Sequence, residues 1–93
     1  MNTYILICKY SCDSLKDISP DRTDKAIMLI RELGGEVKAM YAVLGSFDAI
    51  LIVTFPSVET AMRASLGLSV LTGISFTTLP AVSVNDFDRM LSP

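Results

Sequence analysis

The sequence predicts an α+β fold in which the order strand, helix, strand, strand, helix, strand builds one four-stranded antiparallel sheet. Two wholly apolar runs, residues 4–8 and 49–53, are typical of strands that are buried on both faces. Two other segments carry apolar residues at helical spacing behind a serine and an acidic first turn. The chain has 93 residues, 51% of them hydrophobic, which predicts a single domain, 1–93, with apolar surface beyond what its core needs.

The first strand is expected over residues 3–10, and a helix follows over residues 20–33. One face of the strand carries Tyr4, Leu6, Cys8 and Tyr10, and the other carries Ile5, Ile7 and Lys9. The helix begins with Ser19 as its cap and Pro20 at its first position. Gly34 and Gly35 end it, because glycine accepts the left-handed backbone that commonly follows a helix.

A hairpin is expected next, with strands over residues 36–43 and 47–55 joined by a turn at Gly45 and Ser46. The first strand alternates plainly, which is typical of a more exposed strand. Its apolar face is predicted to hold Val37, Ala39, Tyr41 and Val43. The second strand is apolar on both faces, so we place it in the centre of the sheet beside the strand over residues 3–10.

The second helix is expected to begin after Ser57, with Glu59 in its first turn. Its apolar side is predicted to hold Val58, Ala61, Met62, Ala64, Leu66, Leu68 and Val70. A polar strand over residues 74–79 that ends near Pro80 is typical of a sheet edge. A short helix over residues 84–91 follows, with Ser83 or Asn85 as its cap.

Two right-handed crossovers turn this order into the ferredoxin-like βαββαβ arrangement, in which both long helices cover one face of the sheet. The other face is left bare, although the two central strands carry apolar side chains there as well. An exposed apolar patch of this kind indicates self-association, so we expect a homo-oligomer that pairs through the sheet face. Two sheets face to face would form a dimeric α/β barrel, and a ring of dimers is a larger assembly of the same kind.

The charge pattern and the missing residue types exclude several function classes. The net charge is −2 and the eight Lys and Arg residues are scattered, which leaves no basic surface for nucleic acid or for a membrane. The apolar runs are too short to span a bilayer, and no signal-peptide pattern is visible, so a cytoplasmic location is expected. The absence of histidine removes imidazole metal sites and Ser-His or Cys-His nucleophiles, and no nucleotide fingerprint is present. We therefore expect neither a metal nor a cofactor.

The two cysteines do not form a recognisable chemical motif. Cys8 and Cys12 are separated by three residues, which is not the spacing of a redox pair, and no further zinc ligands accompany them. Cys8 is expected to lie in the core. Cys12, on a polar connection, is either inert or exposed and open to oxidation.

Asp48 is the sharpest polar candidate, because it stands at the start of a strand that is otherwise built for burial. Either it is a functional carboxylate, or it lies at the sheet rim and bonds to the turn at Gly45. Lys9, Tyr10 and Tyr41 belong to the same region, and with Asp48 they would suit a small ligand with a polar head. The alternative is that the tyrosines pack at strand ends with their hydroxyls in water. For both sets we favour the structural interpretation.

The run VLGSFDAILIV, residues 43–53, resembles the signature of the GYD-domain family, which normally has a glycine, any residue, a tyrosine and an aspartate before an apolar strand. Further similarities extend along nearly the whole chain, at Tyr10, Leu15, Lys16, 20–22, 33–35, Thr72, Gly73 and 78–81. The motif positions here are Gly45, Phe47 and Asp48. Phe47 stands where the family usually has its tyrosine, so we interpret this position as a packing residue.

The resemblance implies a dimeric α/β barrel, and it implies no defined activity because the family is mostly uncharacterised. The strand order and the glycine-to-aspartate turn are more distantly similar to the ligand-binding domains of feast/famine amino-acid regulators. Those domains associate through their sheets and bind small molecules between subunits.

The sequence thus predicts a self-associating α/β-barrel domain that binds a small molecule at or near its subunit interface. The alternative is a small cofactor-independent enzyme of the dimeric α/β-barrel monooxygenase type, an interpretation that rests on fold analogy. A structural assembly unit, which needs no pocket, is a third class. The residues leave open whether the chain is an enzyme.

Overall fold

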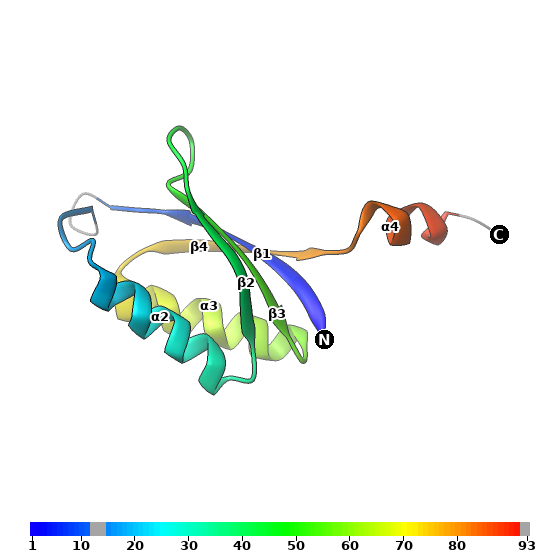
Figure 1. Cartoon of the computed structure of the whole chain (residues 1–93), viewed down its shortest axis with the longest axis horizontal. Coiled ribbons are helices and arrows are strands. Elements are labelled where there is room, and N and C mark those ends of the chain that lie inside the picture. The colour runs from blue at the N-terminus through cyan, green and yellow to red at the C-terminus, as the bar shows by residue number, and fades with distance from the viewer. Residues whose placement is uncertain (12–14, 92–93) are drawn as a thin grey trace.

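A computed structural model of the chain describes residues 1–11 and 15–91, and it has the predicted ferredoxin-like α+β fold (Figure 1). The elements are β1 (Asn2–Lys9), α2 (Pro20–Glu32), β2 (Glu36–Ala42), β3 (Ala49–Phe55), α3 (Val58–Thr72), β4 (Ser75–Ala81) and α4 (Val84–Met90). The strands form one antiparallel sheet in the order β2-β3-β1-β4. The two apolar strands, β1 and β3, therefore lie at its centre, as predicted, and α2 and α3 cover one face.

The helix boundaries follow the predicted capping residues. The Ser19 hydroxyl accepts a hydrogen bond from the Arg22 backbone N–H at the start of α2. Ser57 does the same for Thr60 at the start of α3, and Gly73 ends that helix in the left-handed conformation. These local signals fix where each helix begins and ends, and the prediction is confirmed at both helices.

The core fills the space between the two long helices and the sheet. Its members are Tyr4, Leu6, Cys8, Ala26, Ile30, Ala49, Leu51, Val53, Phe55, Ala61, Ala64, Leu68 and Ile74. On the opposite face of the sheet, Ile5, Ile7, Ile50 and Ile52 remain partly exposed. Each central strand thus divides its apolar side chains between the core and a face that neither α2 nor α3 covers.

The apolar side of α3 departs from the prediction, because only its small half is buried. Ala61, Ala64 and Leu68 are fully buried. The larger residues at four-residue spacing are exposed: Val58 57%, Met62 58%, Leu66 69% and Val70 88%. Alanines let the helix axis approach the sheet closely, and this approach turns the neighbouring row of large side chains outward. The predicted burial of that row is wrong.

The hairpin strands depart from the prediction in two respects, the alternation of β2 and the start of β3. Val37 lies opposite Val53, but Ala39 lies opposite Ile52, because the register shifts between Val37 and Ala39. Such a bulge adds one residue and moves the following side chains to the other face, so the predicted common face of Val37, Ala39 and Tyr41 is wrong. In addition, β3 begins at Ala49, and Phe47 lies in the β2–β3 turn rather than on the strand.

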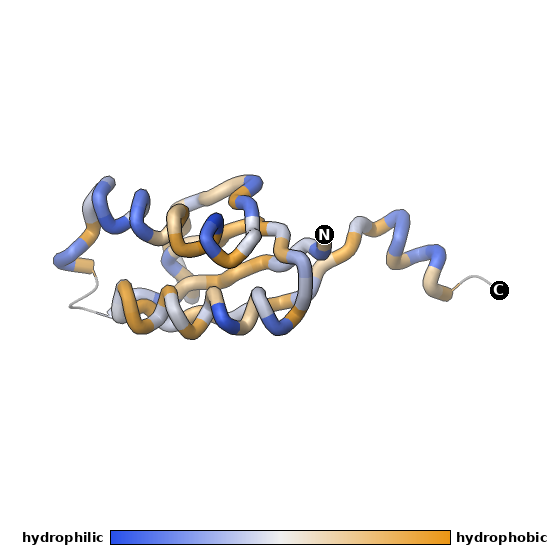
Figure 2. Tube along the Cα trace, turned by 90° about the horizontal axis from the view of Figure 1, so that it is seen from below, coloured by the Kyte–Doolittle hydropathy of each residue, from blue (hydrophilic) through white to orange (hydrophobic). Residues whose placement is uncertain are grey.

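The last two elements lie at the edge of the fold. Within the described residues β4 pairs with β1 alone, and it continues past the predicted end, through Pro80, to Ala81. Proline is tolerated there because an edge strand needs no second set of ladder bonds. α4 then projects away from the sheet and the two long helices, as Figures 1 and 2 both show. Ser83 caps it, as one of the two predicted residues, by accepting a bond from the Asp86 N–H.

Candidate functional site

Asp48 joins the end of β1 to the start of β3. Its backbone N–H donates to the Cys8 carbonyl at 2.9 Å, and its carbonyl accepts from the Val43 N–H at 3.0 Å. Its carboxylate oxygen Oδ2 accepts from the Tyr10 N–H at 2.7 Å. The structural interpretation expected a bond to the Gly45 turn. The side-chain bond instead goes to Tyr10, where it satisfies a backbone donor just beyond the last residue of β1.

Lys9 approaches the same carboxylate from the exposed side. Its Nζ lies 3.8 Å from Asp48 Oδ2, and the Lys9 side chain is 58% exposed against 20% for Asp48. A pair of this kind is screened by water and contributes little to stability. The Asp48 carboxylate is thus largely covered and bonded on one oxygen, which suits it to hold the sheet end together.

Tyr10 lies between this carboxylate and the first turn of α2. The Arg22 guanidinium carbon lies 5.4 Å from the centroid of the Tyr10 ring, a cation–π arrangement. Burial, and next the neighbouring Cys8, raise the pKa of the Tyr10 phenol above its usual value, although Arg22 acts in the opposite direction. The phenol therefore stays protonated at neutral pH and can donate a hydrogen bond.

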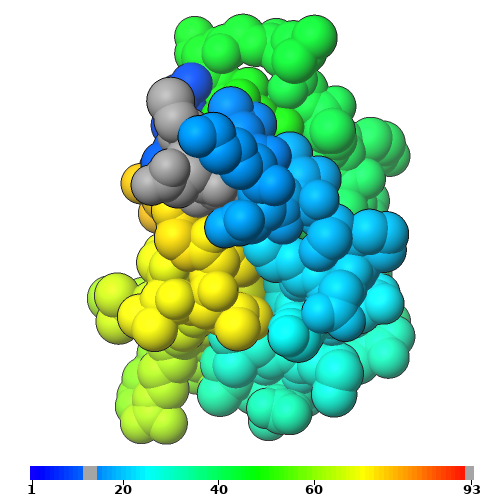
Figure 3. All heavy atoms as spheres, turned by 90° about the vertical axis from the view of Figure 1, so that its left-hand side faces the viewer, coloured from blue at the N-terminus to red at the C-terminus, as the bar shows by residue number. Residues whose placement is uncertain are grey.

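Three of the four predicted ligand-binding residues border one open hollow at this end of the sheet. Tyr10, Tyr41 and Asp48 contribute to its lining, and its volume is about 410 Å³. The remaining lining residues are Leu15, Ile18, Thr23, Met40, Ala42, Val43, Leu44, Ala49 and Leu51. Lys9 lies outside this lining. Figure 3 faces this end of the molecule, where the β2–β3 turn, in green, stands above the start of α2.

The motif residues lie at the rim of this end. Gly45 has φ +140°, a backbone conformation that favours glycine, and a Cβ added there would meet no atom of the described residues beyond its chain neighbours within 4 Å. The Phe47 side chain is 45% exposed. Of the three motif positions, only Asp48 borders the hollow.

The Cys8 thiol is buried beneath the same strand end. Burial, and to a smaller extent the Asp48 carboxylate, raise the pKa of Cys8 to about 12. The thiol therefore stays protonated and unreactive at neutral pH. Cys12 lies outside the described residues.

Across the described ranges, no three His, Cys, Asp or Glu side chains come together as a possible metal site. Among the same residues, no helix is long and apolar enough to cross a membrane.

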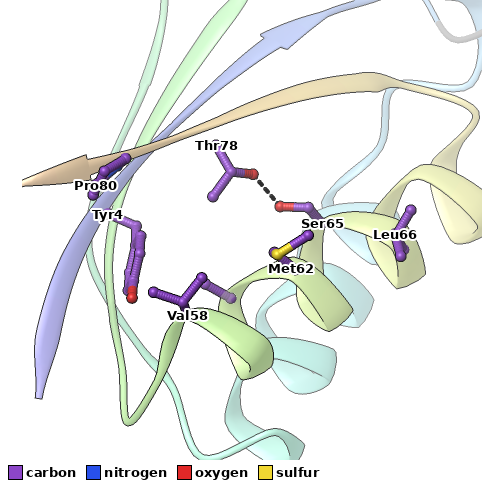
Figure 4. A pocket seen from close by; sticks show the side chains of 8 residues that line it. Tyr4, Val58, Met62, Ser65, Leu66, Thr78 and Pro80 are labelled. Carbon is purple, nitrogen blue, oxygen red and sulfur yellow. Dashed lines mark hydrogen bonds between the residues drawn. The ribbon is translucent and has the colours of Figure 1, made fainter.

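A second hollow, between α3 and β4, was missed by the sequence reasoning. Its volume is about 380 Å³, and its lining includes Tyr4, Val58, Met62 and Leu66, with Pro80 at one end (Figure 4). The Ser65 and Thr78 hydroxyls lie within it and bond to each other. The signal that could have found it is the four-residue repeat of large apolar residues along α3, beside a second repeat of alanines.

Comparison with known proteins places the chain in a family. The model of the GYD domain matches residues 4–91. The chain is 32% identical over 89 residues to the "Glutamine synthetase and cystathionine beta-lyase binding protein" of Thermus thermophilus, covering 92% of this chain and 94% of that protein. Among solved structures, the leucine response regulatory protein LrpA of Mycobacterium tuberculosis superposes with a TM-score of 0.59 at 12% identity. The match covers 89% of this chain and 51% of that one, so this chain spans about half of its length.

The structural likeness agrees with the ferredoxin-like sheet, and at 12% identity it shows the fold alone. The family match spans β1 to α4 and includes the predicted motif at Gly45 and Asp48. The chain belongs to the GYD domain family.

Proposed function

We propose that the chain is a non-catalytic binding protein that works as a pair of copies joined through the open faces of their sheets. The observation that carries the proposal is the isoleucine cluster on that face. Ile5 lies directly opposite Ile52, and Ile7 lies opposite Ile50, so the four side chains are cross-strand neighbours in the two central strands. They form one continuous apolar patch in the middle of the sheet.

The surroundings of the patch favour a second sheet as its cover. Leu79 and Tyr41 flank it from the edge strands, and they are 42% and 61% exposed. Charged Lys9 lies at the end of β1, away from the centre of the patch. Two such faces can pack against each other about 10 Å apart, with the same residues contributed by each copy. Apolar surface is then removed from water on both sides.

The name of the Thermus relative supports a binding role, because that protein is named for two enzymes that it binds. The alternative of a cofactor-independent enzyme needs an available general base. The Asp48 carboxylate is instead engaged by the Tyr10 N–H and by Lys9. Bonded in this way, Asp48 serves the sheet end, and the binding role is the better supported of the two.

The variant Ile52→Lys tests the pairing. Burying an unpaired ammonium group in an apolar interface costs at least about 3 kcal/mol, so the dimer dissociation constant is expected to rise by about 100-fold or more. Sedimentation equilibrium at micromolar concentrations measures this change, and circular dichroism checks that the variant is folded. The matched control is Met28→Lys on α2, where the side chain is 57% exposed. A wild-type monomer, or equal masses for all three proteins, would contradict the proposal.

A small-molecule site is a second candidate, favoured by the hollow that Tyr10, Tyr41 and Asp48 share. Its lining is mainly apolar, with one carboxylate, two phenols and the Thr23 hydroxyl, so it suits an apolar body that carries a cationic head. The Asp48 side chain is 20% exposed, and its contacts with Tyr10 and Lys9 both involve Oδ2, so a cationic head would approach Oδ1. The bound molecule would lie near the rim of the sheet, beside the surface through which the copies pair.

Phenethylamine is a suitable probe for this site, with 3-phenylpropionate as its counterpart of opposite charge. We expect calorimetry to detect the amine and not the acid. Asp48→Asn should weaken amine binding by about tenfold, because it removes the charge but keeps an acceptor for the Tyr10 N–H. Asp24→Asn, an exposed position on α2, is the control. Equal binding of the amine and the acid, or no binding of either at millimolar concentration, would remove the site.

A further inference from the structure

We propose that the C-terminal arm of one copy, residues 82–91, docks into the α3–β4 groove of a second copy. The groove is the hollow of about 380 Å³ whose lining includes Tyr4, Val58, Met62, Leu66 and Pro80. This contact lies on the helix side of the sheet, so it is separate from the proposed pairing through the open face. It goes beyond that pairing because it assigns a role to the arm and an occupant to the groove.

The arm carries apolar side chains that the fold leaves exposed. All of its residues are exposed, and Val84, Phe87, Met90 and Leu91 are between 56% and 83% exposed. Yet α4 is helical and capped by Ser83. A helix of seven residues is marginal in water and takes most of its stability from packing. Packing of Phe87 and Met90 against another surface would therefore stabilise the arm.

The polarity and the length of the groove suit the arm as its occupant. Its accessible lining is almost wholly apolar, and its two hydroxyls, those of Ser65 and Thr78, bond to each other. Among the described residues, no charged side chain belongs to the lining. From Val58 to Leu66 the floor of the groove extends about 12 Å along α3, and the α4 helix is about 10 Å long. Length and polarity thus match.

The position of the arm favours a second copy over the arm's own groove. Only Val82 and Ser83 separate β4 from α4, and α4 continues outward from the strand end (Figure 1). To enter its own groove, the arm would have to reverse within these two residues, where Ser83 holds the helix cap in an extended conformation. A second copy reaches the groove with the cap intact.

The groove also continues to the base of the arm. Tyr4, Val58 and Pro80 line the groove and also a neighbouring hollow that Phe87 and Met90 border. An incoming arm in the groove would therefore lie next to the base of the local arm. Two copies related by a twofold axis can exchange arms in this way and bury both grooves in one closed contact.

Disulfide trapping tests the exchange in the full chain. Two single variants, Met62→Cys in the groove and Met90→Cys in the arm, are each made in a Cys12→Ser background and mixed after one has been isotope-labelled. Both positions are exposed, at 58% and 65%, so the substitutions leave the core intact. Under mild copper-phenanthroline oxidation, the mixed Met62→Cys/Met90→Cys dimer should form at least about tenfold faster than the dimer of Met90→Cys with Met28→Cys. Met28 is an equally exposed methionine, at 57%, on α2.

The outcomes separate the possible occupants. A mixed disulfide above the Met28→Cys control supports the exchange. An intramolecular disulfide in the double variant Met62→Cys/Met90→Cys, with no mixed dimer, would show that the arm fills its own groove and would overturn the proposal. If disulfides form at equal rates between Met90→Cys and Met62→Cys and between Met90→Cys and Met28→Cys, the proposal is overturned as well. A failure of the sheet pairing would be seen in a separate experiment, because Ile52→Lys would then have the same assembly mass as the wild type in sedimentation equilibrium.

Discussion

Replacing Phe55 by alanine is expected to lower the free energy of unfolding by about 3–5 kcal/mol. Phe55 is fully buried at the end of β3, where its ring lies against the Tyr4 ring with the centroids 6.1 Å apart. Alanine would remove this contact and leave a cavity that the close-packed core cannot fill. Because small domains are stable by only about 5–15 kcal/mol, much of the stability would be lost. Thermal denaturation should show a drop of about 12 °C or more.

Phe47→Ala is the matched control for this prediction. It removes the same side chain from the β2–β3 turn, where Phe47 is 45% exposed, so the loss should stay below about 1 kcal/mol. Comparable losses at the two positions would contradict the assignment of Phe55 to the core and Phe47 to the rim. The comparison also tests whether the aromatic residue at the motif position has a packing role, as the sequence reasoning interpreted it.

The order of elements and the centre of the sheet were predictable because their signals are local. Ser19 and Ser57 cap helices through their own hydroxyls, and Gly73 ends α3 with a left-handed backbone. The runs in β1 and β3 are apolar on both faces, which is typical of central strands, and the sheet places them there. None of these features depends on how distant segments pack.

The errors arose where tertiary packing decides between locally equivalent choices. On α3, periodicity marks an apolar side but does not say whether the alanines or the larger residues Met62 and Leu66 approach the sheet. On β2, one extra residue between Val37 and Ala39 reverses the parity of the strand, and no residue type there announces a bulge. The repeat of large apolar residues on α3 is visible in the sequence, but its exposure, and with it the groove, depends on how the helix packs against the sheet.

The candidate site was predicted only in part, because the topology sets which strand ends meet but does not set which hydrogen bonds their side chains form. Strand ends from a hairpin and a neighbouring strand must meet, so the proximity of Tyr10, Tyr41 and Asp48 followed from the topology. Strand parity already set Lys9 on the face opposite to Tyr10, and Lys9 lies outside the hollow lining. The partner of the Asp48 carboxylate, the Tyr10 backbone N–H, depends on the register between β1 and β3 and required the structure.

Gly35→Ala is expected to lower the free energy of unfolding by about 1–3 kcal/mol, although alanine adds only a methyl group. A Cβ at position 35 would overlap Cε1 of Phe55 and would lie 2.9 Å from the carbonyl oxygen of Thr54. Gly35 is not among the glycines with positive φ, so glycine is needed there for space and not for backbone freedom. Urea denaturation measures the loss.

Gly67→Ala is the control for this prediction, because no comparable loss of stability is expected there. The nearest atom to a new Cβ is Leu29 Cδ2 at 3.1 Å, the end of a flexible side chain, and alanine favours the helix by about 1 kcal/mol. This variant should be near neutral. If Gly35→Ala were equally neutral, the close approach of Phe55 to the chain at Gly35 would be contradicted.

A double-mutant cycle identifies which contact requires the glycine. In a Phe55→Leu background the aromatic atoms nearest to position 35 are absent, so Gly35→Ala should lower the stability by less than it does in the wild type. If Gly35→Ala lowers the stability equally in both backgrounds, the contact that requires glycine is the one with the Thr54 carbonyl, which Phe55→Leu leaves in place. A reduced loss would show that the Phe55 ring, which fills the end of the core, also selects glycine at the entry to β2. One buried aromatic residue would then link the packing of the core to the start of the edge strand.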